Sequence, residues 1–192
     1  MKPQADIAVR AGRLVYVIGP SGAGKDSIIG YARQRLGADR ERHVFARRHI
    51  TRPADSGGED HIAISAADFE RDCATGRFAL AWRGNDLGYG VGIEIDWWLE
   101  SGRHVILNGS RGYLPKAADR YPHLLPVLIA IDPAVLRQRL SARGRETSDE
   151  IEARIQRAMA LQVIQHPALA TIANNGSLTE AGEAFVALLK SL

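Results

Sequence analysis

The sequence has one cysteine, no long hydrophobic run and few lysines. Cys73 stands alone among 192 residues, which excludes a disulfide framework and a zinc site built on cysteines. The six histidines lack the spacing of a zinc site. No apolar run approaches the ~20 residues of a membrane span, and the polar first residues do not resemble a secretory signal. These absences predict a cytoplasmic protein without a membrane partner.

Positive charge comes almost entirely from arginine, since only four of the 25 basic residues are lysines. Many of the arginines fall in two stretches, residues 33–52 and 137–157. A guanidinium group offers a planar fork of donors that fits phosphate, so the two stretches favour a phosphorylated ligand. A nucleic acid backbone is the weaker alternative, and solvated faces are a third. The net charge of +3 is compatible with all three interpretations of the arginines. We expect no nucleic acid partner.

A glycine-rich motif lies between a strand-like run and a helix-like stretch. The apolar run at residues 14–18 is followed by Gly19-Pro20-Ser21-Gly22-Ala23-Gly24-Lys25, and then by helical spacing to about residue 36. This is the spacing and context of a phosphate-binding P-loop, in which backbone N–H groups point inward at a helix N-terminus. A turn that binds nothing is the weaker alternative. We expect all seven residues to bind ATP, with Lys25 also catalytic at the outer phosphates.

The residue after Lys25 departs from the P-loop pattern. Asp26 occupies the position where the motif has a Ser or Thr whose hydroxyl binds Mg²⁺. A carboxylate is also a hard oxygen ligand, so we expect Asp26 to bind Mg²⁺ directly. The strand expected at residues 104–107 ends in Asn108 rather than in the acid that often binds the metal. The alternative is that Asp26 or Ser27 only caps the helix. We include both among the nucleotide-binding residues.

The hydrophobic pattern predicts an α/β fold with a parallel sheet flanked by helices. Strand-like runs alternate with helical spacing, and such an order favours right-handed crossovers between parallel strands. The expected strands are residues 14–18, 104–107 and 124–131, and the expected helices are 25–36, 149–165 and 178–192.

Two parts of the chain do not follow that alternation. Residues 47–92 combine strand-like pieces with turn signals and one short helix, near residues 66–75, which Ser65 would cap. They predict a small, partly antiparallel, acceptor-binding insertion. The arginine-rich segment at about 137–150 contains Gly144 and predicts a mobile lid. The whole chain is then one kinase domain, with a core at about 12–46 and 103–192.

Several further motifs accompany the P-loop at Gly19–Lys25: Thr51-Arg52-Pro53, Gly58-Glu59-Asp60, Tyr89-Gly90 and Arg139-x-x-x-Arg143-Gly144. Together they resemble the guanylate kinase superfamily, nearly from end to end. Within it, Gly24–Ser27, Ile50–Asp55, Gly58–His61 and Asn108–Arg111 are similar to the ribose 1,5-bisphosphate phosphokinases of phosphonate breakdown. The resemblance implies an ATP-dependent phosphotransferase that converts ribose 1,5-bisphosphate into 5-phosphoribosyl 1-diphosphate with Mg²⁺.

The departures from guanylate kinases concern the acceptor. Leu80 stands where that family reads guanine with a glutamate, and Asp55 replaces a second phosphate-binding arginine. An Asp-Tyr pair of the family appears here as Asp60-His61. Losing the hydrogen-bonding partners of a base costs a site orders of magnitude in discrimination. The resemblance therefore implies a sugar phosphate acceptor rather than a nucleotide.

The resemblance also assigns roles by position. Arg52 and Tyr89 would hold an acceptor phosphate, and Asn174 would contact adenine. Arg47, Arg48 and Arg111 have no counterpart in guanylate kinases; they would bind the second phosphate of a bisphosphate or lie on the surface. Glu59, Asp60 and His61 would bind ribose hydroxyls or metal, or shape their loop. The lid arginines that would surround the transferring phosphoryl group are Arg139, Arg143 and Arg154.

Two other functions are compatible with such a fold. The first is a nucleoside monophosphate kinase acting on GMP, which Leu80 and Asp55 disfavour. The second is a non-catalytic interaction module, a class that typically loses the P-loop, whereas residues 19–25 are complete here. The sequence leaves the oligomeric state open between monomer and homodimer.

Overall fold

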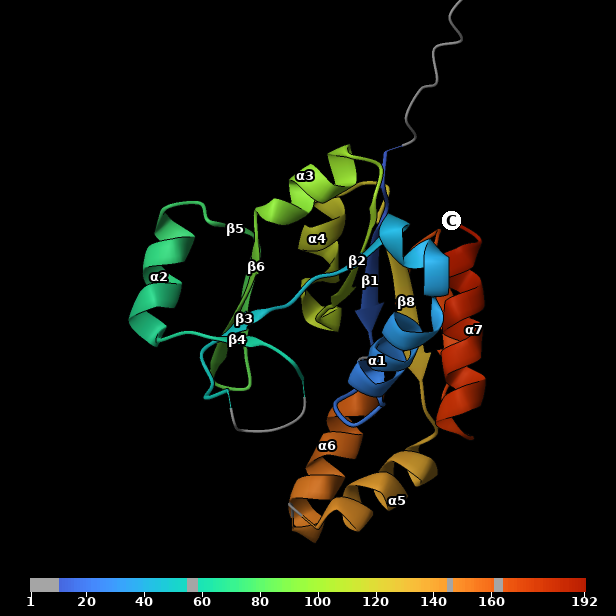
Figure 1. Cartoon of the computed structure of the whole chain (residues 1–192). Helices are drawn as coiled ribbons and strands as arrows, with labels where there is room; N and C mark the ends of the chain where they lie inside the picture. The colour runs from blue at the N-terminus through green and yellow to red at the C-terminus, as the bar shows by residue number, and fades with distance from the viewer. Residues whose placement is uncertain (1–10, 55–58, 145–146, 161–163) are drawn as a thin grey trace, which may run out of the picture.

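The main sheet has five parallel strands in the order β2-β7-β1-β8-β9 (Figure 1). The computed structural model describes residues 11–54, 59–144, 147–160 and 164–192. A parallel sheet with helical crossovers confirms the predicted α/β class. The strands are β1 (Leu14–Ile18), β2 (His43–Phe45), β7 (His104–Asn108), β8 (Leu125–Ala130) and β9 (Ala170–Ala173).

Helices cover both faces of this sheet because its central strand is apolar on both sides. Val15 and Val17 of β1 pack on one face, and Tyr16 and Ile18 pack on the other, as the alternation of side chains along a strand requires. α1 (Lys25–Arg35) and α7 (Leu178–Lys190) cover the first face; α3 (Glu94–Glu100) and α4 (Leu114–Arg120) cover the second. No helix in the described ranges is both long and apolar enough to cross a membrane.

The insertion forms a second sheet in the order β4-β3-β6-β5, which confirms its partly antiparallel character. β5 and β6 form a hairpin whose turn residues Asn85 and Asp86 both have positive φ, as a type I′ turn requires. Ser65 caps α2 by accepting a hydrogen bond from the Asp68 amide, as predicted. The elements are β3 (His49–Ile50), β4 (Ile62–Ala63), α2 (Ala66–Ala74), β5 (Phe78–Gly84) and β6 (Leu87–Gly92).

The predicted lid corresponds to the end of one helix and the start of the next. α5 (Pro133–Arg143) stops at Gly144, whose left-handed φ of 61° suits a helix C-terminus. α6 (Ser148–Ala160) follows, and residues 145–146 and 161–163 lie outside the described chain. The two helices share a small hydrophobic cluster separate from the two sheet clusters. They extend away from the sheet on the side of the P-loop (Figure 1).

Candidate active site

The P-loop lies between β1 and α1. Asn174, the residue that follows β9, contacts it. Gly24 has φ 86°, and a Cβ there would come 2.6 Å from Nδ2 of Asn174, so only glycine fits. The same Nδ2 donates a 2.7 Å hydrogen bond to the carbonyl of Ala23. The Asn174 side chain is buried. Asn174 therefore positions the P-loop, and its expected contact with adenine stays a prediction.

The side chain of Lys25, the last residue of the P-loop motif, reaches back to the start of the P-loop. Its Nζ donates hydrogen bonds of 3.0 Å to the carbonyls of Gly19 and Pro20. Burial lowers the pKa of Lys25 to about 8; the positive charges of Arg48 and Arg111 contribute to this shift, and the negative charge of Asp26 opposes it. An ammonium group that is held among other cations and deprived of water is poised to bind an anion.

Asp26 and Asn108 connect the P-loop to the acceptor insertion. Nδ2 of Asn108 donates a 2.6 Å hydrogen bond to Oδ1 of Asp26 and lies 3.5 Å from Oε2 of Glu59. Oδ1 of Asn108 is buried and has no hydrogen-bond partner within the described residues. An exposed carboxylate beside an orphaned amide oxygen is a donor set that suits Mg²⁺. The predicted metal residue, Asp26, thus fits this role.

Glu59 forms a hydrogen-bonded ion pair with Arg48. Nε of Arg48 donates to Oε1 of Glu59 at 2.8 Å, and its Nη2 donates to Oε2. The guanidinium group lies over the ring of Tyr89, 4.9 Å from its centroid. Sequence reasoning left Arg48 open between phosphate binding and the surface, and missed Asn108 as a link. Only the fold shows that these residues meet.

The other predicted acceptor residues divide into two groups. His61 is buried, and its ring nitrogens lie 2.9 and 3.1 Å from the carbonyl oxygens of Glu59 and Arg52. Nη2 of Arg52 lies 3.3 Å from Nδ1 of His61, so these two side chains contact each other. Asp60 instead forms an ion pair of 2.9 Å with Arg47 and is largely exposed. A direct contact of Asp60 with an acceptor stays a prediction.

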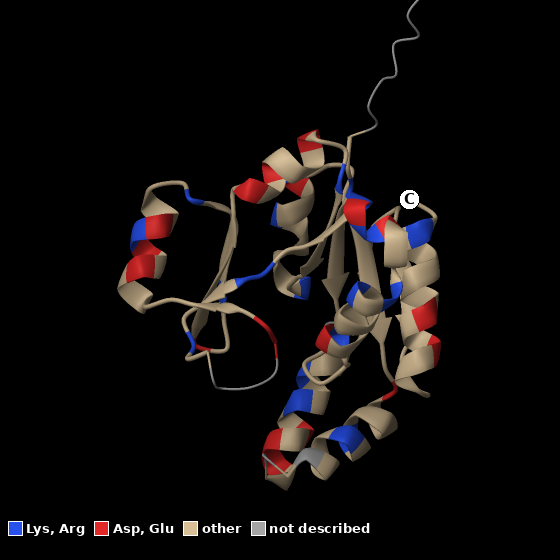
Figure 2. Ribbon diagram, in the orientation of Figure 1, with Lys and Arg blue, Asp and Glu red and all other residues tan. Residues whose placement is uncertain are grey.

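The lid arginines contact the nucleotide side of the site at two points. Nη1 of Arg154, from α6, donates a 3.0 Å hydrogen bond to Oγ of Ser21 in the P-loop. Nη2 of Arg139, from α5, donates a 3.0 Å hydrogen bond to the carbonyl of Gly176. The side chain of Arg143 lies outside the described atoms. Figure 2 shows Lys and Arg along α5 and α6 and on the segment between β2 and β3, so basic groups approach from both the lid and the insertion.

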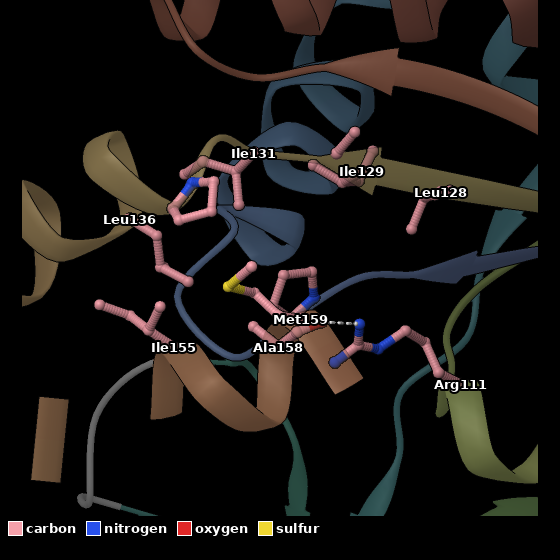
Figure 3. A pocket seen from close by; sticks show the side chains of 11 residues that line it. Arg111, Leu128, Ile129, Ile131, Leu136, Ile155, Ala158 and Met159 are labelled. Carbon is pink, nitrogen blue, oxygen red and sulfur yellow. Dashed lines mark hydrogen bonds between the residues drawn. The ribbon is translucent and has the colours of Figure 1, made fainter. Parts of the chain in front are cut away.

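An apolar cavity of about 220 Å³ lies behind α6, beside the P-loop residue Pro20. Figure 3 shows Met159 reaching into it and Arg111 at its edge, where Nη1 donates a 3.0 Å hydrogen bond to the carbonyl of Ala158. Most of the walls are aliphatic side chains of β8, α5 and α6. Such walls do not solvate phosphate charges, so this cavity does not suit a phosphate group.

Comparison with known proteins agrees with this geometry. The guanylate kinase family model matches residues 11–191. A ribose 1,5-bisphosphate phosphokinase from Desulfomicrobium baculatum is 51% identical over 177 residues, covering 92% of this chain and 94% of that protein. A protein of the same name from Thiobacillus denitrificans is 51% identical over 180 residues, covering 93% of each chain.

Solved structures show the same fold at low identity. Guanylate kinase from Anaplasma phagocytophilum superposes with a TM-score of 0.65 at 18% identity, over 95% of this chain and 86% of that one. A gluconokinase from Sinorhizobium meliloti gives a TM-score of 0.52, also at 18% identity, over 95% of this chain and 93% of that one.

Proposed function

Because the chain belongs to the guanylate kinase family, and within it to the ribose 1,5-bisphosphate phosphokinases, we propose that it transfers the γ-phosphoryl group of ATP to ribose 1,5-bisphosphate. The products are 5-phosphoribosyl 1-diphosphate and ADP. The observation that carries this proposal is the complete P-loop, with Lys25 held across it and joined through Asp26 and Asn108 to the insertion. The relatives at 51% identity support the choice of acceptor.

Positioning and charge neutralisation account for the catalysis. The backbone amides of the P-loop and the ammonium group of Lys25 hold the ATP phosphates, and Arg154 approaches them from the lid. Asp26, beside the amide oxygen of Asn108, would hold Mg²⁺, which would supply positive charge to offset the charge of the ATP phosphates. An oxygen of the C1 phosphate attacks the γ-phosphorus, and the bond to the β,γ-bridging oxygen breaks to release ADP. The attacking oxygen is already anionic, so the protein need not remove a proton.

The insertion favours a sugar phosphate over GMP. Leu80 is 1% exposed and packs in the apolar cluster on the α3 and α4 side of the sheet, so it offers no acceptor for a base. Asp55, the other departure from guanylate kinases, lies outside the described residues. An interaction module remains the alternative from another class, and the P-loop disfavours it. The cytoplasmic location and the oligomeric state stay predictions.

The acceptor is tested by ADP release from Mg·ATP in three parallel reactions, with ribose 1,5-bisphosphate, with GMP and without acceptor. We expect turnover only with the sugar bisphosphate. Turnover with GMP alone would show that other groups read the base and would overturn the proposed acceptor. A lack of ATP binding in calorimetry would instead favour the interaction module.

The pKa of Lys25 predicts how ATP affinity depends on pH. Lys25 binds phosphate as the ammonium ion, and its pKa in the free protein is lowered to about 8. ATP raises that pKa, so binding takes up a proton above pH 8 and the affinity falls there, by about tenfold per pH unit. Calorimetric titration between pH 7.5 and 9.5 measures this dependence. Lys25→Arg keeps its charge throughout and should flatten the curve; a wild-type affinity constant to pH 9.5 would contradict the assignment.

Arg154 is expected to act on the transferring phosphoryl group. Arg154→Met removes a charged donor that reaches the P-loop at Ser21, and we expect kcat to fall by about 100-fold. Arg157→Met, on the same helix but bound to the carbonyl of Ala153, serves as the control and should keep its activity. Equal kcat values for both variants would remove Arg154 from the mechanism.

A further inference from the structure

We propose that Arg48 binds the C1 phosphate of the acceptor, the group that attacks ATP, and that Glu59 is the positioning residue that holds Arg48 in place. The inference rests on the proposed function and deepens it by assigning one phosphate of the acceptor to one side chain. Four observations carry it: the burial of Arg48, its fixed orientation, the open end of its guanidinium group and its position beside the P-loop.

The Arg48 side chain is largely buried and lies over two aromatic rings. Its side chain is only 11% exposed, which excludes a surface role. The guanidinium group lies 4.9 Å from the ring centroid of Tyr89 and 5.8 Å from that of Trp82. These two rings are themselves stacked at 5.5 Å with an interplanar angle of 6°. A planar cation fixed against such rings loses little freedom when it binds a ligand.

Glu59 occupies only one edge of the guanidinium group. The carboxylate accepts hydrogen bonds from Nε and Nη2, and it is itself only 13% exposed. Within the described residues, Nη1 of Arg48 makes no hydrogen bond, so the outer edge formed by Nη1 and Nη2 remains for a second anion. A buried ion pair is weak evidence for stability, whereas an arginine fork with one open edge is suited to bidentate phosphate binding.

Arg48 is linked to the P-loop through Glu59. Glu59 is 3.5 Å from Nδ2 of Asn108, which binds Asp26, the neighbour of Lys25 in sequence. Arg48 and Lys25 are therefore cations at the two ends of the chain of contacts Glu59–Asn108–Asp26. An anion bound between them reduces the repulsion between the two positive charges. The attacking phosphate requires this place, because it must contact the γ-phosphate held by Lys25.

The insertion contains a natural comparison for this pair. Arg83 forms an ion pair with Glu70 and lies 5.4 Å from the ring centroid of Phe69, so it repeats the chemistry of Arg48. Its side chain, however, is 67% exposed and belongs to the outer hairpin. Arg83→Met therefore controls for the loss of an arginine from the insertion, without touching the site.

Steady-state kinetics with ribose 1,5-bisphosphate test the proposal, together with inhibition by ribose 5-phosphate, which lacks the C1 phosphate. In Arg48→Met we expect kcat/KM for the bisphosphate to fall by about 100-fold or more. ATP affinity and the inhibition constant of ribose 5-phosphate should stay within about twofold of wild type. Glu59→Gln, which loosens Arg48, should raise KM for the bisphosphate more than it lowers kcat.

Because Arg48→Met leaves the carboxylate of Glu59 buried and unpaired, the double variant Arg48→Met/Glu59→Gln provides a neutral replacement of both partners. It should melt close to wild type and keep the same loss of kcat/KM. Wild-type kcat/KM in this variant, or an equal loss of ribose 5-phosphate binding, would overturn the role of Arg48 while the proposed function stands. A wild-type protein that does not use the bisphosphate would overturn both.

Discussion

Lys25→Met should lower kcat for phosphoryl transfer by about 1,000-fold. The variant keeps the length of the side chain but removes the ammonium group that binds the carbonyls of Gly19 and Pro20 and that we expect to neutralise the outer phosphates of ATP. Developing charge on the transferring group is then left without its nearest cation. ADP release with ribose 1,5-bisphosphate at saturating Mg·ATP measures the effect.

Lys116→Met provides the control for that experiment. Lys116 is exposed on α4 and lies 6.0 Å from the ring centroid of Tyr113. We expect its replacement to leave kcat unchanged. If Lys25→Met retained more than about a tenth of wild-type kcat, the P-loop would not be the site of transfer.

Asp26→Ala should lower kcat by about 100-fold and raise the Mg²⁺ concentration needed for half-maximal activity. The variant removes the exposed carboxylate that follows Lys25, and with it the 2.6 Å hydrogen bond from Asn108. Without this carboxylate, Mg²⁺ would lose the charged protein ligand of the site. A titration of ADP release against Mg²⁺ measures both quantities.

Two further variants show whether the loss of kcat in Asp26→Ala comes from the lost metal ligand. Asp119→Ala removes an exposed carboxylate from α4 and should behave as wild type. Asp26→Ser restores the hydroxyl of the ordinary P-loop motif, and we expect it to recover part of the activity with a changed Mg²⁺ requirement. Full activity of Asp26→Ser with an unchanged Mg²⁺ requirement would show that the carboxylate does not bind the metal.

The parts of the fold that carry local signals were predictable from sequence. The P-loop needs glycines and a lysine at fixed spacing between a strand and a helix, and β1 and α1 lie where that spacing placed them. The insertion was recognised by its strand-like pieces and turn signals, and the Ser65 cap by Asp68 three residues later. Each of these features depends on neighbouring residues in the chain.

The elements that sequence reasoning missed are short. β2 has three residues, and α3 and α4 have seven each, which is too few for a periodic hydrophobic pattern to stand out. Their place in the fold is set by packing against the sheet rather than by their own propensity. The expected α6 reached residue 165, whereas its described part ends at Ala160.

The site residues show the same division. The role of Asn174 toward the carbonyl of Ala23 joins positions 151 residues apart, and no local pattern reveals it. Arg48 and Glu59 are closer in sequence. The guanidinium group of Arg48, however, packs on Tyr89 and Trp82, which belong to the β5–β6 hairpin. Sequence thus named candidate residues for both substrates, and only the fold shows that Arg48, Glu59 and Tyr89 lie together.

The most direct test is the ³¹P NMR spectrum of the product formed from ribose 1,5-bisphosphate and Mg·ATP, recorded after removal of nucleotides. Transfer to the C1 phosphate predicts two mutually coupled diphosphate signals and an unchanged C5 monophosphate signal. The amount of ADP, measured before the nucleotides are removed, should equal the amount of product. A third monophosphate signal would place the transfer on a ribose hydroxyl. Inorganic phosphate as the only new signal would show ATP hydrolysis. Either of these spectra would contradict the account.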